Sequence, residues 1–158
     1  EAAEARIPRD DRRGRFRTTC RAVRRWALEH QHEYFLIYGT PVPGYRAPED
    51  TIAPATRVAT IMITLMVEEA VAGGRDRESE HDAVSPDVHR ALSPMRGSVP
   101  ADVSDAQMVS GLSVFSAVFG AVSFELGGQL HNVIRETETS RAAFFDAQID
   151  RWLTSLGW

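Results

Sequence analysis

The chain has 158 residues, of which 43% are hydrophobic and 25% charged, and its formal net charge is −4 at pH 7. These are the values of an ordinary soluble globular chain, and the length predicts a single domain over residues 1–158. Cys20 is the only cysteine, which excludes an internal disulfide and a cysteine-based metal cluster.

The two ends of the chain differ in charge. Residues 1–25 contain nine arginines and four acidic residues, a net charge of +5, so the remainder carries −9. A basic end on an acidic body can indicate a neighbouring nucleic acid, but a solvated helix face explains it more simply. The chain starts without methionine, so we expect part of a longer protein, and because no signal peptide is visible we expect it in the cytoplasm.

The first predicted helix begins near Asp10 or Asp11, either of which can cap it, and ends near Tyr38. Steps of three and four residues mark one apolar face, which His30 joins in register. That face consists of Phe16, Cys20, Val23, Ala27, Tyr34 and Ile37. Gly39 and Pro41 cannot continue the helix.

A corner rich in proline and glycine follows, "YGTPVPGYRAPED" from Tyr38 to Asp50. A flexible tether uses Gly and Ser, whereas Pro stiffens a connection. We therefore expect a fixed angle between the first and second helices.

The second predicted helix runs from about Asp50 to Ala72, with Pro54 tolerated in its first turn. Its middle, Val58 to Val67, is apolar nearly all round, which is typical of a helix wrapped by its neighbours. We expect it to be the central element of the core.

Residues 75–103 are polar and rich in Pro, Ser and Asp. A short helix within Ser85 to Met95 is predicted, capped by Ser85 with Pro86 at its first position. The preceding stretch, "GGRDRESEHD", is predicted to be a mobile loop, and its glycines lack the spacing of a phosphate-binding loop.

The third long helix has the clearest start in the chain. Ser104 and Gln107 form a predicted capping box, with Val103 and Met108 as a hydrophobic staple. Its large apolar face is Met108, Leu112, Phe115, Phe119, Val122 and Leu126. A second face carries only small residues, which predicts close approach by another helix backbone: Ser113, Ser116, Gly120, Ser123 and Gly127.

The last predicted helix runs from about Ser140 to Leu156 and presents many aromatic and aliphatic side chains along one side. Its apolar residues are Phe145, Ile149, Trp152, Leu153 and Leu156, extended by Phe144 and Trp158. A surface this apolar at a chain end is expected to dock against something large. Since no useful period-2 segment occurs, the predicted class is all-α.

The polar residues do not form a recognisable catalytic set. His30 and His32 would point about 200° apart on a helix, so they cannot share a metal ion, and we expect no metal and no cofactor. His131 near Glu125 could form an acid–base pair, but no nucleophile or second carboxylate supports it. If Glu125 is buried it needs a partner, so it could hold a ligand's polar end or lock two helices together.

Three stretches carry a family resemblance. "RRWALEHQHEYFLIYGTPVPGYRAPEDTIAPATRV", Arg24 to Val58, resembles the C-terminal regulatory domain of one branch of TetR-family transcriptional regulators. "VFGAVSFELGGQLHNVI" and "AFFDAQIDRWLTSLG", which lie between Val118 and Gly157, resemble the end of that domain. The chain departs from the pattern at Gly127-Gly128, where one bulkier residue is expected, and in the polar insert from Gly73 to Glu80.

The resemblance implies an all-helical domain that binds a ligand and dimerises, preceded by a helix-turn-helix module that lies outside this chain. It also implies that the last two helices pair with those of a second subunit as a four-helix bundle. The residues expected at this interface are Ser113, Ser116, Gly120, Ser123, Gly127, Phe145, Ile149, Trp152 and Leu153. The proline-rich corner would then pass helix shifts on to the DNA-binding module.

The sequence therefore predicts the effector domain of a homodimeric regulator, a repressor by preference, that contacts operator DNA through the upstream module and no membrane. A small apolar or amphipathic ligand should bind among the first three long helices, although core packing also explains these residues. The expected lining is Trp26, His30, Tyr34, Met62, Met66, Phe115 and Phe119, with Glu125. A helical ligand-binding domain without a gene-regulatory role is the alternative, and an enzyme is the least favoured.

Overall fold

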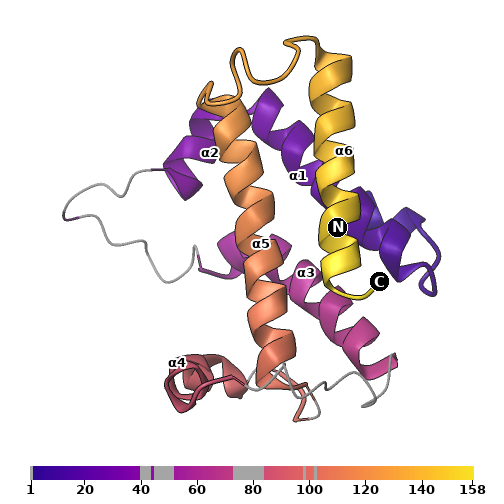
Figure 1. Cartoon of the computed structure of the whole chain (residues 1–158), viewed down its shortest axis with the longest axis vertical. Coiled ribbons are helices and arrows are strands. Elements are labelled where there is room, and N and C mark those ends of the chain that lie inside the picture. The colour runs from indigo at the N-terminus through magenta and orange to yellow at the C-terminus, as the bar shows by residue number, and fades with distance from the viewer. Residues whose placement is uncertain (1, 40–43, 45–51, 73–83, 98, 102) are drawn as a thin grey trace.

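The computed structural model describes residues 2–39, 44, 52–72, 84–97, 99–101 and 103–158 (Figure 1). Within these ranges the chain forms six α-helices and one short 3-10 turn, with no strand, so the all-α prediction is confirmed. The elements are η1 (Glu4–Arg6), α1 (Arg12–Glu29), α2 (Gln31–Tyr38), α3 (Ile52–Ala72), α4 (Pro86–Arg96), α5 (Asp105–Leu126) and α6 (Glu138–Ser155).

The first predicted helix is in fact two helices. The Asp11 side chain caps α1 by accepting a hydrogen bond from the Gly14 N–H at 2.8 Å. At His30 the backbone leaves the helical region, with φ −132° and ψ 55°, and α2 begins at the next residue. The backbone of His30 still bonds to Trp26 and Tyr34 at 2.9 Å each, so the change of direction leaves its N–H and C=O paired. No Pro or Gly marks this break, which is why the sequence pattern missed it.

The other helix starts follow their capping residues. Ser85 caps α4, and the reciprocal capping box of Ser104 and Gln107 opens α5, as predicted. The predicted staple residues Val103 and Met108 belong to one buried cluster. Helix α6 begins two residues earlier than expected because Thr137 caps it.

Helix α5 ends at the paired glycines. The Gly127 N–H bonds to the carbonyl of Ser123 at 2.8 Å, and Gly128 follows with φ +76°. This left-handed conformation strains a residue with a side chain. The turn therefore explains a glycine where the family resemblance led us to expect a bulkier residue.

The core lies where α1 crosses behind the α5–α6 pair, as Figure 1 shows. Helix α1 contacts α2, α3, α5 and α6, and α5 contacts α1, α3, α4 and α6. Helix α3, which we expected to be the central element, packs chiefly against α1 and α5 within the described residues. Helix α3 leaves Thr60 and Thr64 exposed and buries Met62 and Leu65. The main buried cluster is Phe16, Cys20, Val23, Ala27, Tyr34, Met62, Leu65, Val114, Val118, Val122, Phe145, Ile149 and Leu153.

The buried face of α5 is rotated from the predicted one. It consists of Met108, Gly111, Val114, Val118 and Val122, while the predicted Phe115 and Phe119 lie half-buried beside it. The helix is apolar on most sides, so periodicity alone did not fix which residues face the core.

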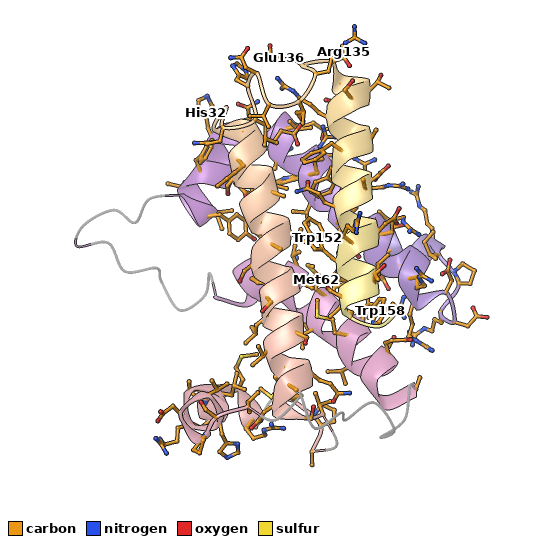
Figure 2. All side chains as sticks on the ribbon, viewed as in Figure 1. His32, Met62, Arg135, Glu136, Trp152 and Trp158 are labelled. Carbon is orange, nitrogen blue, oxygen red and sulfur yellow. The ribbon has the colours of Figure 1, made fainter. Side chains whose placement is uncertain are left out.

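The C-terminal aromatic surface docks on the chain itself. Trp158 packs edge-on against Phe16 of α1 with 5.3 Å between ring centroids, whereas Trp152 packs against Phe145 of its own helix. Figure 2 labels both tryptophans. The core side of α6 therefore docks on α1 and α5 of the same chain. The proline-rich corner and the predicted mobile loop at 73–82 lie outside the described residues, apart from Tyr38, Gly39 and Gly44 at the corner.

Candidate functional site

A cleft lies at the start of α5, between α3, α4 and the segment that joins α4 to α5. Figure 1 shows α4 lying across this end of α5. The cleft is narrow. Its empty volume is about 440 Å³ when the solvent-filled opening is included. It is lined by Ile63, Met66, Val67, Met95, Val99, Val103, Gln107, Met108, Gly111, Leu112 and Phe115. Its chemistry is apolar, with Gln107 as the one polar side chain among these residues.

Local structure explains why the cleft forms here. Ser85 caps the short helix α4. Leu92 of α4 then packs with Val103 and Met108 in a second buried cluster at the start of α5. Three of the four methionines of the chain, Met66, Met95 and Met108, line the cleft. Because methionine is unbranched and polarizable, such walls adapt to irregular guests.

Gly111 allows α3 and α5 to approach each other inside the cleft. A Cβ at position 111 would lie only 2.9 Å from the Sδ atom of Met66. The absent side chain therefore accommodates the thioether of α3, and this contact forms one wall. Sequence reasoning singled out Gly120 and Gly127 but missed Gly111, although a glycine inside a long helix was the available signal.

A charged cluster fastens α4 to the start of α5. The Asp105 carboxylate accepts hydrogen bonds from the Arg96 guanidinium and contacts the His89 Nδ1 at 2.5 Å. Arg96 also donates to the carbonyl of Val103 at 2.6 Å. The side chain of Asp105 is 14% exposed, whereas that of His89 is 68% exposed. These bonds hold the walls of the cleft together and balance charge near it.

The predicted lining residues divide between three places. Met66 and Phe115 lie in the lining of the cleft. Met62 and Tyr34 are fully buried in the main core, where the Tyr34 hydroxyl donates to the carbonyl of Phe119 at 2.9 Å. Trp26 and His30 are exposed at the surface and pack on each other, and Phe119 packs between Phe115 and Tyr38.

Glu125 locks helices together and does not face the cleft. Both of its oxygens accept hydrogen bonds from Arg24 of α1, at 2.6 and 2.7 Å, and its side chain is 5% exposed. Arg24 also donates to Glu138 of α6 at 2.9 Å and lies over the Phe145 ring. Burial opposes the charge on Arg24, but the hydrogen bonds to these two carboxylates outweigh it and raise its pKa. One guanidinium thus joins α1, α5 and α6.

Other arginines of α1 form similar bonds. Arg12 bonds to Glu69 and Arg15 to Glu68, both on α3, and Arg15 also reaches Glu4 at 2.5 Å. On the opposite side, Arg17 and Arg21 bond to Asp150 and Asp146 of α6. The basic start of the chain is therefore largely bonded to the acidic body, which weakens its interpretation as a nucleic-acid surface.

The histidines remain apart from any metal-binding arrangement. Among the described residues, no group of three or more His, Cys, Asp or Glu side chains could hold a metal ion. His131 lies 3.8 Å from Glu136, and both side chains are more than half exposed. Glu125, the partner considered for His131 in the sequence, is bonded to Arg24.

The predicted dimer residues of α5 and α6 have different surroundings. Ser113, Ser116 and Gly127 are exposed, and a Cβ on Gly120 would meet nothing within 4 Å. Ser123 shares a hydrogen bond with Tyr34. Within the described chain no helix backbone approaches Gly120, so the face is open.

On α6 the prediction needs correction. Ile149 and Leu153 are fully buried within this chain, and Phe145 is 3% exposed, so none of them is free to contact a second subunit. They face α1 and α5 because their spacing follows the core side of α6. Trp152 is only half-buried, and Phe144, which is 38% exposed, presents the outer side of this helix.

Helix α5 keeps much of its apolar surface exposed. Among the described helices, α5 is long and apolar enough, by length and composition alone, to cross a membrane. Its mean hydropathy is 1.6 over an 18-residue window, and 28% of that window is buried in this structure. Ser and Gly are interspersed among its apolar residues, so it contains no long uninterrupted apolar run. Val109 and Phe124 are exposed along it, the latter at 57%.

Comparisons with known proteins agree with this architecture. A family model described as the tetracycline repressor-like C-terminal domain matches residues 16–152. The HTH-type transcriptional regulators Rv1816 of Mycobacterium tuberculosis and Mb1846 of Mycobacterium bovis are each 32% identical over 129 residues. The match covers 81% of this chain and 53% of each relative, so the chain spans about half the length of the curated relatives it matches.

A solved crystal structure is also similar. It is that of SCO4313, a protein described as regulatory, with a TM-score of 0.58 and 29% sequence identity. The similarity covers 88% of this chain and 60% of that one. The family match over residues 16–152 and the all-helical fold agree. The chain belongs to the tetracycline repressor-like family and corresponds to its C-terminal domain.

Proposed function

We propose that this chain is the effector-binding and dimerisation domain of a DNA-binding transcriptional repressor, in which an apolar or amphipathic small molecule modulates operator binding. The apolar cleft at the start of α5 is the observation that carries the proposal. Family membership supports the regulatory role, and the names of the curated relatives support an HTH-type module outside this chain. Such a protein works in the cytoplasm.

The lining of the cleft favours binding over turnover. Its described residues include no titratable side chain, and Gln107 is the single polar one. Small-molecule sites are commonly mostly apolar with a few placed polar groups, which is the composition found here. Acid–base or nucleophilic chemistry needs groups that this lining does not supply.

The open face of α5 supports a homodimer. Its exposed apolar residues, Val109 and Phe124, flank the small residues Ser113, Ser116 and Gly120, so a helix of a second subunit could approach closely. Soluble monomers rarely expose large contiguous apolar patches. We propose that a second copy of the chain, and not a membrane, covers this exposed face of α5. Phe144 of α6 extends the same proposed interface.

Filling the cleft tests the ligand site. Leu112→Trp places a larger side chain in the lining and should weaken binding of a neutral apolar dye such as Nile red by at least about tenfold. Fluorescence titration measures the affinity, and circular dichroism checks that the helices remain.

Leu36→Trp is the matched control, because Leu36 is 80% exposed on α2 and lies outside the cleft. It should bind the dye as the unmodified chain does. Equal affinity in the Leu112→Trp variant would contradict the assignment of this cleft.

A further inference from the structure

We infer that the effector is an uncharged molecule bearing a hydrogen-bond acceptor, such as a carbonyl or ester oxygen, and that the side-chain amide of Gln107 donates to it. This inference rests on the proposed ligand site and specifies the chemistry of the guest. Gln107 serves two purposes at once: it caps α5, and it supplies the polar group in the wall of the cleft.

The cap fixes which end of the amide is available. The backbone N–H of Ser104 donates to the Gln107 Oε1 at 2.7 Å, and the backbone N–H of Gln107 donates to the Ser104 hydroxyl at 3.2 Å. A backbone N–H can only donate, so its partner must be the oxygen of the amide. The Nε2 group, with its two N–H donors, is then the part of the side chain left for a guest.

The Nε2 group is open to solvent, because the Gln107 side chain is partly exposed and no buried side-chain donor among the described residues lacks a partner. Among the described residues no hydrogen bond from the Gln107 Nε2 is found, and the surrounding lining is apolar. A donor against an apolar wall loses free energy when a guest displaces water without offering an acceptor. An acceptor on the guest removes that cost, so the amide selects for it.

Charge near the cleft is already balanced. Asp105 in the first turn of α5 bonds to both Arg96 and His89 of α4. A carboxylate on the guest would have to compete with Asp105 for these groups, and an ammonium group would find no free carboxylate in the lining. A neutral acceptor therefore fits best.

The capping box allows a substitution that removes the N–H donors of Gln107 and keeps the oxygen that caps the helix. Either Glu or Gln at this position completes such a box, so Gln107→Glu keeps the oxygen that accepts from Ser104 but replaces the N–H donors with a second carboxylate oxygen. The fold is retained while the donor is lost. Ser104→Ala is the matched control, because it weakens the cap and leaves the amide in place.

The probes are methyl heptyl ketone and nonane, which have equal chain lengths and differ by one carbonyl group. Binding is followed by NMR of labelled methionine methyl groups. Met66, Met95 and Met108 line the cleft and should shift, whereas Met62 is fully buried in the main core and serves as an internal reference.

We expect the ketone to bind about tenfold more tightly than nonane. Gln107→Glu should remove that preference, and Ser104→Ala should keep it. Equal affinities for the two probes, or a preference that survives in Gln107→Glu, would overturn the inference and leave the ligand site standing. If neither probe shifts Met66, Met95 or Met108, the ligand site fails as well.

Discussion

At the scale of single residues, Arg24 joins α1 to both α5 and α6. Its guanidinium is buried and bonded to Glu125, whose side chain is 5% exposed, and to Glu138, whose side chain is 68% exposed. Removing one partner of a buried pair leaves the other charge without compensation, whereas exposed pairs contribute little. The ion pair with Glu125 should therefore contribute more to the free energy of unfolding than the ion pair with Glu138.

Arg24→Leu should lower the free energy of unfolding by about 3–5 kcal/mol, because Glu125 remains buried and unpaired. Glu138→Gln should lower it by less than about 1 kcal/mol. Urea denaturation followed by circular dichroism measures both. Equal losses in the two variants would mean that burial of Glu125 does not determine the stability of this cluster.

Cys20 provides a prediction about pH. Burial raises the pKa of its thiol from 9.0 to about 12. The unfolded chain therefore releases the thiol proton first, so the contribution of Cys20 to stability is present below pH 9 and is lost as pH rises from 9 to 12.

Urea unfolding measured across this pH range should show a smaller alkaline loss in Cys20→Ala than in the unmodified chain. Tyr34 and Tyr38 also have pKa values raised by burial, so part of the loss should persist in the variant. An identical alkaline loss would show that the Cys20 thiol ionises alike in both states.

At the scale of elements, helix starts were predictable and helix faces were less so. The capping box at Ser104 and Gln107 depends on local sequence, and the structure has it as predicted. The predicted buried face of α5 is rotated from the observed one, because valines and aromatic residues are spread around a helix that is apolar on most sides. The break at His30 carries no Pro or Gly and was missed for that reason.

The site was less predictable than the fold. Met66 and Phe115 were identified because they lie on apolar helix faces. Met95, Val99 and Val103 were not, because their place in the cleft depends on how α4 packs across α5, a contact between elements that no local pattern specifies. Glu125 was left with two open roles, and its partner Arg24 lies 101 positions away in the chain.

Gly111→Ala tests the contact between α3 and α5. Alanine favours the helix by about 1 kcal/mol, and the new Cβ must displace the Met66 thioether, which lies 2.9 Å away and is flexible. We expect a change in unfolding free energy within about 1 kcal/mol but weaker binding of apolar dyes. A large loss of stability in urea denaturation would show instead that Met66 cannot move.

At the scale of the whole molecule, the two sides of α5 have separate proposed roles. One side lines the cleft with Met108, Gly111 and Phe115, and the other presents Gly120 and Phe124 to solvent. A guest in the cleft would therefore press on the helix that forms the proposed dimer interface, which offers a physical route from ligand to subunit arrangement.

Phe124→Glu should convert the proposed dimer to a monomer. Phe124 is 57% exposed in the single chain, so the substitution costs the monomer little but places a charge in an apolar interface. Sedimentation velocity over a range of concentrations measures the change. Leu36→Glu, at an exposed site on α2, is the control and should remain dimeric; dissociation of both variants, or of neither, would argue against this interface.

Native mass spectrometry of the freshly purified chain tests the central claim most directly. The account predicts a dimer that carries a small neutral molecule, with the bound mass absent from the Leu112→Trp variant. A bare chain that takes up no apolar compound, or a bound molecule that Leu112→Trp retains in full, would contradict it.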